Sequence, residues 1–305
     1  MPETPHLGIL DRPEAEKLIK EHFSTQITLL QEIANYGSNL VIRAFNSSSK
    51  SLGDALTCGV LLRQVVAMVD AVETLVASGA VHAAHLPARA AFEASLYLEW
   101  MLVSDLERKA KYYYVSNMRQ ERMWALRGIH GSPDNQSFSA AIAQLGTDIM
   151  SLRPSLANDS KALLTEVDRI LAQPEFSPID QDFEQRKQKT RREPKWHAPL
   201  GPGTVRQIAK DLQRLPEYEL FYSKCSQVTH TGSFEDYLRF SKGHLTFKPV
   251  RRLDGISALL NFTFSMAFRC YEIVLKNYRP GEIKSFTTRY VAEWREPFLS
   301  IKDVA

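Results

Sequence analysis

The sequence contains few cysteines, the residues that cross-link small secreted proteins and bind zinc. Its 305 residues include three cysteines, Cys58, Cys225 and Cys270, which lie far apart and form no Cys-x-x-Cys pair. An odd number of widely spaced cysteines argues against a disulfide framework and against a zinc knuckle. We therefore expect each cysteine to be a small buried apolar residue in a reducing compartment, which predicts a cytoplasmic protein.

The sequence motifs of several large enzyme classes are also missing. There is no His-Glu-x-x-His zinc motif, no Gly-x-x-x-x-Gly-Lys phosphate loop, no Gly-x-Ser-x-Gly elbow and no Gly-x-Gly-x-x-Gly dinucleotide loop. The pair Glu3 and His6 has the Glu-x-x-His spacing of di-iron bundles, but it encloses Pro5 close to the N-terminus. We expect no metal and no cofactor, and we set aside zinc proteases, P-loop enzymes, elbow-type serine hydrolases and nicotinamide enzymes.

Neither charge nor hydrophobicity reaches an extreme. The formal net charge is +3, which is too mild to imply nucleic-acid binding by itself. The longest run without Asp, Glu, Lys, Arg or His, residues 255–268, is shorter than the roughly 20 residues of a membrane-spanning helix, so we expect a core helix there. The polar N-terminus does not resemble a signal peptide, and we expect no membrane association.

Helical periodicity is the main positive signal. Apolar residues recur at helical spacing, and Thr204 with Gln207 forms a capping-box pattern before a further helix. A strand is suggested at Leu245-Thr246-Phe247 alone. We predict an all-α fold, an elongated bundle of about eight to ten helices. The expected long helices cover residues 11–45, 53–78, 86–114 and 255–278, and shorter ones cover residues 138–152, 160–172 and 218–231.

Proline-rich and polar stretches suggest how the chain is divided. A polar cluster at residues 46–49 predicts a loop, and five prolines within residues 174–202 predict a long irregular segment. We expect an N-terminal helical arm at residues 1–48, a helical core domain at residues 49–282 and a C-terminal tail at residues 283–305. The arm is a candidate dimer element, so a homodimer is one expected assembly.

The first candidate site is on the expected third helix. Arg89 and Glu93 are four residues apart, so they share one helix face, and their neighbours are apolar. Buried charges require partners because an unpaired charge is very costly. The structural interpretation, which we favour, is an intrahelical ion pair that braces the bundle. The functional interpretation is a catalytic or binding site.

The second candidate site is a polar stripe near the end of a later helix. Tyr222, Ser226 and His230 follow one another at intervals of four residues. Such groups can bind an oxygen-rich ligand or transfer a proton, since imidazole titrates near neutral pH. The structural interpretation, which we favour, is a histidine that ends the helix and binds a carbonyl group or a carboxylate.

The third candidate site is a basic run followed by an aromatic residue. Positive charge next to Trp196 suits a nucleic-acid backbone with one stacked base. Glu184 and Glu193 dilute this charge, so we favour the structural interpretation, a solvated loop. The predicted nucleic-acid-binding residues are Arg186, Lys187, Lys189, Arg191, Arg192, Lys195 and Trp196.

These constellations together carry a resemblance to a known family. Arg89 with Glu93, Lys195-Trp196, and Tyr222-Ser223 with Ser226 and His230 are similar to the recurring marks of an all-helical bacterial family of unknown function. The resemblance covers roughly residues 52–278. It implies an all-helical fold and says almost nothing about activity.

A more distant similarity is to the HEPN superfamily, whose helical dimers include metal-independent ribonucleases of toxin and phage-defence systems. Those enzymes carry Arg-x(4–6)-His, and the literal matches here, about as many as chance predicts, end at His197 and His244. The similarity therefore implies a site assembled from different helices. Arg89 would bind phosphate, His230 would act as general acid or base, and Glu93, Tyr222 and Ser226 would orient them.

The sequence leaves two functional hypotheses. The favoured one is a non-catalytic helical module that binds a ligand, RNA or a protein partner. The alternative is a HEPN-like RNA endonuclease that uses Arg89 and His230. We favour binding because the nuclease hypothesis depends on a distant similarity of fold.

Overall fold

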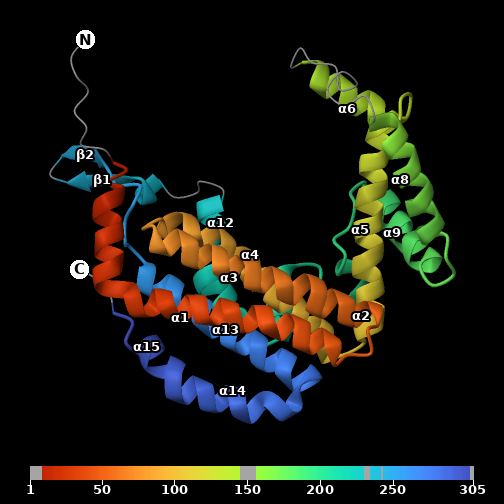
Figure 1. Ribbon diagram of the computed structural model, residues 1–305. Coiled ribbons are helices and arrows are strands. Elements are labelled where there is room, and N and C mark those ends of the chain that lie inside the picture. The colour runs from red at the N-terminus through yellow and green to blue at the C-terminus, as the bar shows by residue number, and fades with distance from the viewer. Residues whose placement is uncertain (1–8, 145–155, 230–233, 242, 303–305) are drawn as a thin grey trace. The chain divides into compact units, whose positions relative to one another are not determined.

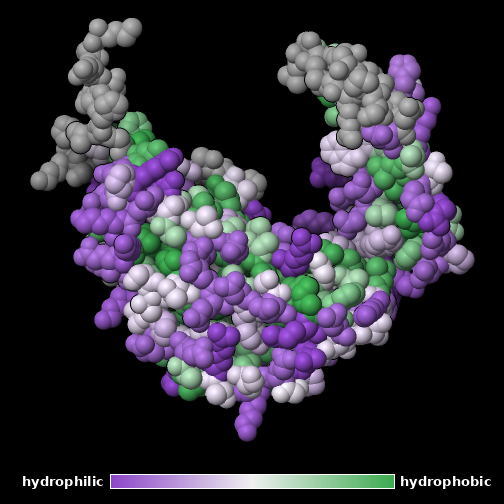
Figure 2. Space-filling view, in the orientation of Figure 1, coloured by the Kyte–Doolittle hydropathy of each residue, from purple (hydrophilic) through white to green (hydrophobic). Residues whose placement is uncertain are grey.

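The structure is a computed structural model that describes residues 9–144, 156–229, 234–241 and 243–302. Helices form most of this part of the chain, and one two-stranded hairpin accompanies them. The predicted all-α fold class is therefore confirmed. Hydrophilic residues occupy most of the surface that Figure 2 shows, interrupted by smaller hydrophobic patches.

The chain divides into two compact units. Unit 1 comprises Met1–Ser104 together with Val205–Ala305, and unit 2 comprises Asp105–Thr204. Each unit is described separately below. The boundaries differ from those of the predicted arm, core and tail, and that division stays a prediction.

The core of unit 1 consists of four long helices that lie side by side in Figure 1. The first begins where the sequence predicts, because the Asp11 side chain accepts a hydrogen bond from the Glu14 N–H and Pro13 occupies the first turn. It packs along the helices of residues 63–77 and 256–278. The four helices are α1 (Arg12–Asn46), α3 (Arg63–Ala77), α4 (Val81–Val103) and α13 (Ile256–Tyr278).

The helix predicted at residues 53–78 is present, but it contains a π-helical segment. It begins as α2 (Leu52–Asp54), continues as the π-helix η1 (Ala55–Leu62) and ends as α3. Ser51 and Asp54 form a capping box at its start. The wider π turns of η1 displace the side chains from ordinary helical spacing, and such segments are frequent at functional sites.

The single helix predicted from Leu86 to beyond Tyr114 is wrong. Helix α4 starts earlier, at Val81, and accommodates Pro87 within its length. It ends at Val103, and α5 (Leu106–Gly128) begins after Asp105, whose φ of 50° is left-handed. A left-handed residue cannot continue a right-handed helix, so the chain breaks there.

Short elements complete unit 1. The suggested strand pairs with a preceding strand, and Leu238 lies opposite Phe247. One face of this hairpin is apolar and largely open to solvent, since Phe240 is 69% exposed and Phe247 is 72% exposed. The elements are α10 (Val205–Asp211), α11 (Leu215–Glu217), η3 (Tyr218–Tyr222), α12 (Ser223–Thr229), η4 (Phe234–Asp236), β1 (Leu238–Ser241), β2 (His244–Phe247), η5 (Pro280–Glu282), α14 (Ile283–Arg289), η6 (Tyr290–Trp294) and α15 (Arg295–Leu299).

Unit 2 is built around α5, which packs against α8 and α9. The irregular segment predicted at residues 174–202 is wrong in part, because Pro178 lies in the first turn of a helix, where proline is favoured. The predicted helix at residues 138–152 extends beyond the described residues. Besides α5 the elements are α6 (Pro133–Ala143), α8 (Leu156–Leu171), α9 (Ser177–Thr190) and η2 (Ala198–Leu200).

The interior of the protein is apolar, as the sequence predicts. All three cysteines are buried and free, which confirms the burial expected for these residues. By length and composition alone, Leu52–Ala77 and Ile256–Tyr278 are apolar enough to cross a membrane. Buried core helices have the same character, and both stretches contribute buried side chains to unit 1.

Candidate functional site

Arg89 on α4 is held by two hydroxyl groups and one aromatic ring. Its Nη2 donates a hydrogen bond to the Tyr222 hydroxyl at 3.1 Å, and its Nη1 donates to the Thr229 hydroxyl at 3.0 Å. The guanidinium carbon lies 4.8 Å from the centre of the Tyr222 ring, a cation–π distance. Its Nε is buried and has no hydrogen-bond partner in the described part of the chain.

Glu93 lies one turn further along α4, and the Tyr222 hydroxyl joins it to Arg89. This hydroxyl donates to Glu93 Oε2 at 3.0 Å, while the Tyr97 hydroxyl donates to Glu93 Oε1 at 2.9 Å. No direct ion pair between Arg89 and Glu93 occurs among the residues that the structure describes. A hydroxyl bridge therefore takes the place of the ion pair considered from the sequence.

The environment of Tyr222 keeps its hydroxyl protonated at neutral pH. Burial raises the pKa of Tyr222 above its ordinary value, and the negative charge of Glu93 adds to this effect. The Arg89 guanidinium opposes both influences and does not cancel them. The phenol can therefore donate to the carboxylate while it accepts from the guanidinium.

The local sequence explains how these side chains meet. Arg89, Glu93 and Tyr97 recur every four residues and line one face of α4. Tyr222 ends the π-helix η3, and its ring stacks on that of Tyr218 at 4.7 Å. We refer to Arg89, Glu93, Tyr97, Tyr222 and Thr229 as the Arg89 cluster.

The structure brings together part of the predicted site. Arg89, Glu93 and Tyr222 contact one another as described, whereas Ser226 is half-buried on α12 and makes no described contact with Arg89. The predicted general acid or base, His230, lies outside the described residues. Tyr97 and Thr229 were missed, although extending the four-residue spacing from Glu93 would have found Tyr97.

A second arginine of unit 1 is fully enclosed and differs from Arg89. Arg214 is 1% exposed, and its guanidinium binds Glu99 at 3.2 Å and Glu217 at 2.6 Å. Arg269 binds Glu99 from another side at 2.6 Å. Carboxylates balance these charges, so the network around the buried Arg214 is an internal brace of the kind that the sequence had suggested for Arg89.

The predicted basic run belongs to unit 2 and is helical in its first part. Arg186 and Lys187 lie in the last turns of α9, where they pair with Asp182 at 2.8 Å and with Glu193 at 3.5 Å. Trp196 is 9% exposed, and its ring packs edge-on against Tyr113 at 5.1 Å. The Trp196 ring is therefore not open to a stacked base. Arg191, Arg192 and Lys195 are exposed.

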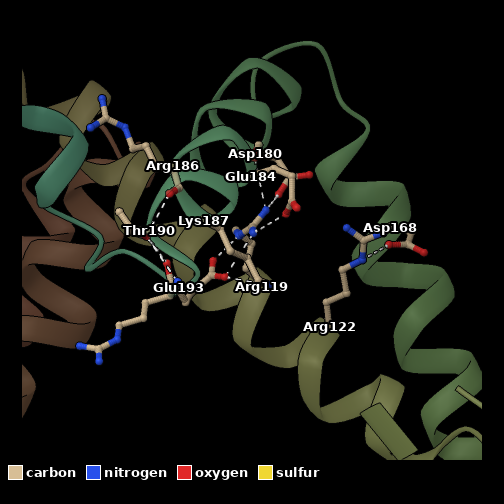
Figure 3. A network of polar contacts seen from close by, with 10 residues as sticks. Arg119, Arg122, Asp168, Asp180, Glu184, Arg186, Lys187, Thr190 and Glu193 are labelled. Atoms are coloured by element: carbon tan, nitrogen blue, oxygen red, sulfur yellow. Dashed lines mark hydrogen bonds and ion pairs between the residues drawn. The ribbon is translucent and has the colours of Figure 1, made fainter. Parts of the chain in front are cut away.

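Arg119 organises the polar contacts around this segment (Figure 3). Its guanidinium binds the carboxylates of Asp180, Glu184 and Glu193, the second at 3.0 Å. Burial alone would lower the pKa of Arg119, but the three carboxylates outweigh it and raise that pKa. The hydrogen bond from Arg119 in turn lowers the pKa of Glu184. This network fixes α5 to α9 and to residue 193 within unit 2.

The described residues contain no group of three or more histidine, cysteine, aspartate or glutamate side chains placed to hold a metal ion. The Family of unknown function (DUF5677) matches residues 55–245. The chain belongs to this family. The match includes Arg89, Glu93 and Tyr222 and confirms the resemblance that the sequence suggested. Searches of the curated proteins and of the solved structures found no match.

The residues that match DUF5677 include all of unit 2 and part of unit 1. The helices α4, η3 and α12, which carry the Arg89 cluster, lie within the matched residues, as does all of unit 2. All of α1 and the helices from α13 to α15 lie outside them. The family has no assigned function, so the function of this chain has to be inferred from its own side chains.

Proposed function

We propose that this DUF5677 protein is a binding module and that Arg89 binds an anionic group of its ligand. One observation carries the proposal. The positive charge of Arg89 is held by neutral hydroxyls and a ring, and no carboxylate within salt-bridge distance balances it among the described residues. Arg89 is also partly exposed, whereas Arg214 is sealed and fully paired.

A phosphate group is the anion that suits this arrangement best. Guanidinium groups recognise phosphate and carboxylate through paired hydrogen bonds, and such charge-assisted bonds are roughly twice as strong as neutral ones. An incoming phosphate can therefore replace the contact of Arg89 with the Thr229 hydroxyl, which is on the exposed side of the cluster. Glu93 opposes an anion, but two tyrosine hydroxyls already bind its carboxylate.

A binding titration tests the proposal with three ligands that each contain phosphate: inorganic phosphate, adenosine monophosphate and a fluorescent single-stranded RNA. We refer to them as phosphate carriers. Arg89→Gln removes the charge and keeps much of the side-chain length. Arg206→Gln is the matched control, because Arg206 is exposed and Glu219 balances its charge at 2.7 Å.

We expect at least one carrier to bind, and Arg89→Gln to weaken its binding about tenfold or more, the effect of losing a charged hydrogen bond. Arg206→Gln is expected to change the affinity less than about threefold. The proposal is wrong if none of the three carriers binds, or if the two variants bind equally well. Unchanged melting temperatures would show that both variants are folded.

RNA cleavage is a second candidate function, favoured by one observation. Thr229, which accepts a hydrogen bond from Arg89, directly precedes His230 in the sequence. The HEPN-like hypothesis pairs Arg89 with His230 in a metal-independent reaction. Labelled RNA should then be cut in the presence of a chelator by the unmodified protein, and cut far more slowly by Arg89→Gln and by His230→Ala. If RNA binds and stays intact, the cleavage hypothesis is wrong and only the binding function is supported.

A further inference from the structure

A surface groove lies between α1 and the helix formed by η1 and α3, and its residues are well separated in sequence from those of the Arg89 cluster. Its volume is about 430 Å³, within the range of small-molecule sites. Apolar side chains form most of its walls, namely Val41, Ile42 and Phe45 on α1, and Ala55 and Val66 opposite.

The groove is open along its length. Ile42 is 62% exposed. Gly59 lies in the middle of η1, and a Cβ atom added to it would meet no other atom within 4 Å. The absence of a side chain at this position therefore leaves space inside the groove.

One cation borders these apolar walls. Arg63, at the start of α3, lines the groove and is exposed. No salt bridge in the described part of the chain includes Arg63. The nearest acidic residues along this helix are Asp70 and Asp54, and no salt bridge of the described residues joins either of them to Arg63. Asp54 is buried and accepts hydrogen bonds from Ser49 and from the Ser51 N–H. The groove thus combines an apolar channel with one positive charge that no carboxylate balances.

We propose that this groove binds a long-chain carboxylate, with the hydrocarbon chain along the apolar walls and the head group on Arg63. The charge of Arg63 complements the carboxylate, and the apolar lining complements the methylene groups. A second copy of the chain fits less well. The immediate sequence neighbours of three groove residues, Asn39, Asn46 and Gln64, are polar and exposed, whereas a stable dimer buries at least about 1,200 Å².

Calorimetric titration of the full chain with dodecanoate, below its micellar concentration, tests the proposal. Dodecan-1-ol serves as the uncharged probe. Gly59→Leu fills the groove, and it is compatible with folding because the added side chain points into open space and leucine favours a helix. Arg63→Gln removes the positive charge and leaves the apolar walls unchanged.

The proposal predicts that dodecanoate binds and that Gly59→Leu weakens its binding about tenfold or more. Arg63→Gln should weaken dodecanoate and leave dodecan-1-ol unchanged. Arg89→Gln should affect neither probe, so that this site and the proposed phosphate site are tested independently.

Three results would each overturn the proposal. The first is that dodecanoate does not bind, and the second is that Gly59→Leu binds it as the unmodified protein does. The third is that Gly59→Leu converts a dimer into a monomer in sedimentation velocity, which would make the groove a contact between copies.

Discussion

Arg89 and Arg214 show how the same side chain serves two purposes in one unit. Arg214 is 1% exposed and is surrounded by Glu99 and Glu217. Breaking a buried pair of this kind typically costs about 3–5 kcal/mol, so Arg214 belongs to the framework of the fold. Arg89 is partly exposed and contacts hydroxyl groups, and this difference from Arg214 is the basis of the proposed anion site.

The bridging hydroxyl of Tyr222 gives the first prediction. Tyr222→Phe removes the hydrogen bonds to Arg89 and to Glu93 and keeps the ring. We expect the free energy of unfolding to fall by about 1–3 kcal/mol, because both lost hydrogen bonds involve charged groups. Urea unfolding measures this change. Tyr218→Phe is the control, since the Tyr218 hydroxyl makes no described contact with either residue, and an equal loss in both variants would contradict the bridge.

The buried thiols give a prediction about alkaline pH. Burial raises the pKa of Cys58 from 9.0 to about 11 and that of Cys270 from 9.0 to about 12. Above pH 9 the unfolded chain therefore loses thiol protons that the folded chain retains. The contribution of these thiols to stability is complete below pH 9 and is lost as the pH rises toward 11 or 12, so stability decreases over that interval.

Urea unfolding at pH 8 and pH 10 tests this prediction. Each buried thiol contributes up to about 1.4 kcal/mol per pH unit to the decrease. Cys270→Ala should therefore lose less stability between these two pH values than the unmodified protein. If the two proteins lose the same amount, the Cys270 thiol titrates in the folded state as it does in the unfolded state.

At the residue scale, the sequence predicts helix faces and burial better than it predicts which side chains contact one another. The spacing of Arg89 and Glu93 correctly indicated one helix face, and the buried state of the cysteines followed from their number and separation. The hydroxyl bridge could not be predicted, because Tyr222 comes from a π-helix 129 residues further along the chain. Arg119 and Arg214 were missed for the same reason, since their carboxylate partners lie mostly on other elements.

Two glycines within helices show how the elements of unit 1 approach one another. A Cβ atom at Gly37 would lie 2.2 Å from the Tyr271 hydroxyl oxygen, so α1 contacts α13 too closely there for any side chain. A Cβ atom at Gly59 would meet nothing within 4 Å. The first glycine is required by packing between helices, and the second is not.

This contrast gives a matched pair of substitutions. Gly37→Ala should lower the free energy of unfolding by about 1–3 kcal/mol, the usual cost of overpacking a core. Gly59→Ala should leave it unchanged or raise it by up to about 1 kcal/mol, because alanine favours a helix. Thermal unfolding of both variants measures the difference. Equal melting temperatures would mean that α1 and α13 pack less closely than the structure shows.

The elements were predictable where capping residues and apolar spacing agree. Asp11 with Pro13 marked the start of α1, and the apolar periodicity gave nearly the full length of α13. The errors come from proline and from a left-handed residue. Pro87 lies inside α4, and Pro178 lies in the first turn of α9. The left-handed residue Asp105 interrupts the single helix that was expected at residues 86–114. A proline signal alone does not distinguish these positions.

For the whole molecule, the division into two units allows stability to be distributed unevenly along the chain. Residues 105–204 form a unit with its own polar network around Arg119, while the chain on either side of it forms the other unit. The sequence analysis did not find this division, because the flanking segments meet only in the folded chain. Local stability can therefore differ between the units.

Arg119→Met tests this independence. Methionine keeps much of the apolar bulk and leaves three carboxylates without their common partner. Amide hydrogen exchange, followed by mass spectrometry, should become about tenfold faster or more in residues 105–204, equivalent to about 1.4 kcal/mol. Exchange in α3 and α13 should stay unchanged. Equal acceleration throughout the chain would show that the two units unfold together.

The central claim for the whole molecule is that the charge of Arg89 is available to an anion, and it can be observed at the guanidinium itself. The measurement is a proton–nitrogen correlation spectrum of the arginine side chains, in which the Arg89 signal is the one missing from the Arg89→Lys variant. Addition of the bound phosphate carrier should shift this signal, since its Nε has no described partner and its other nitrogens contact hydroxyls. An Arg89 signal that stays in place while other arginine signals move would contradict the claim and would locate the anion elsewhere.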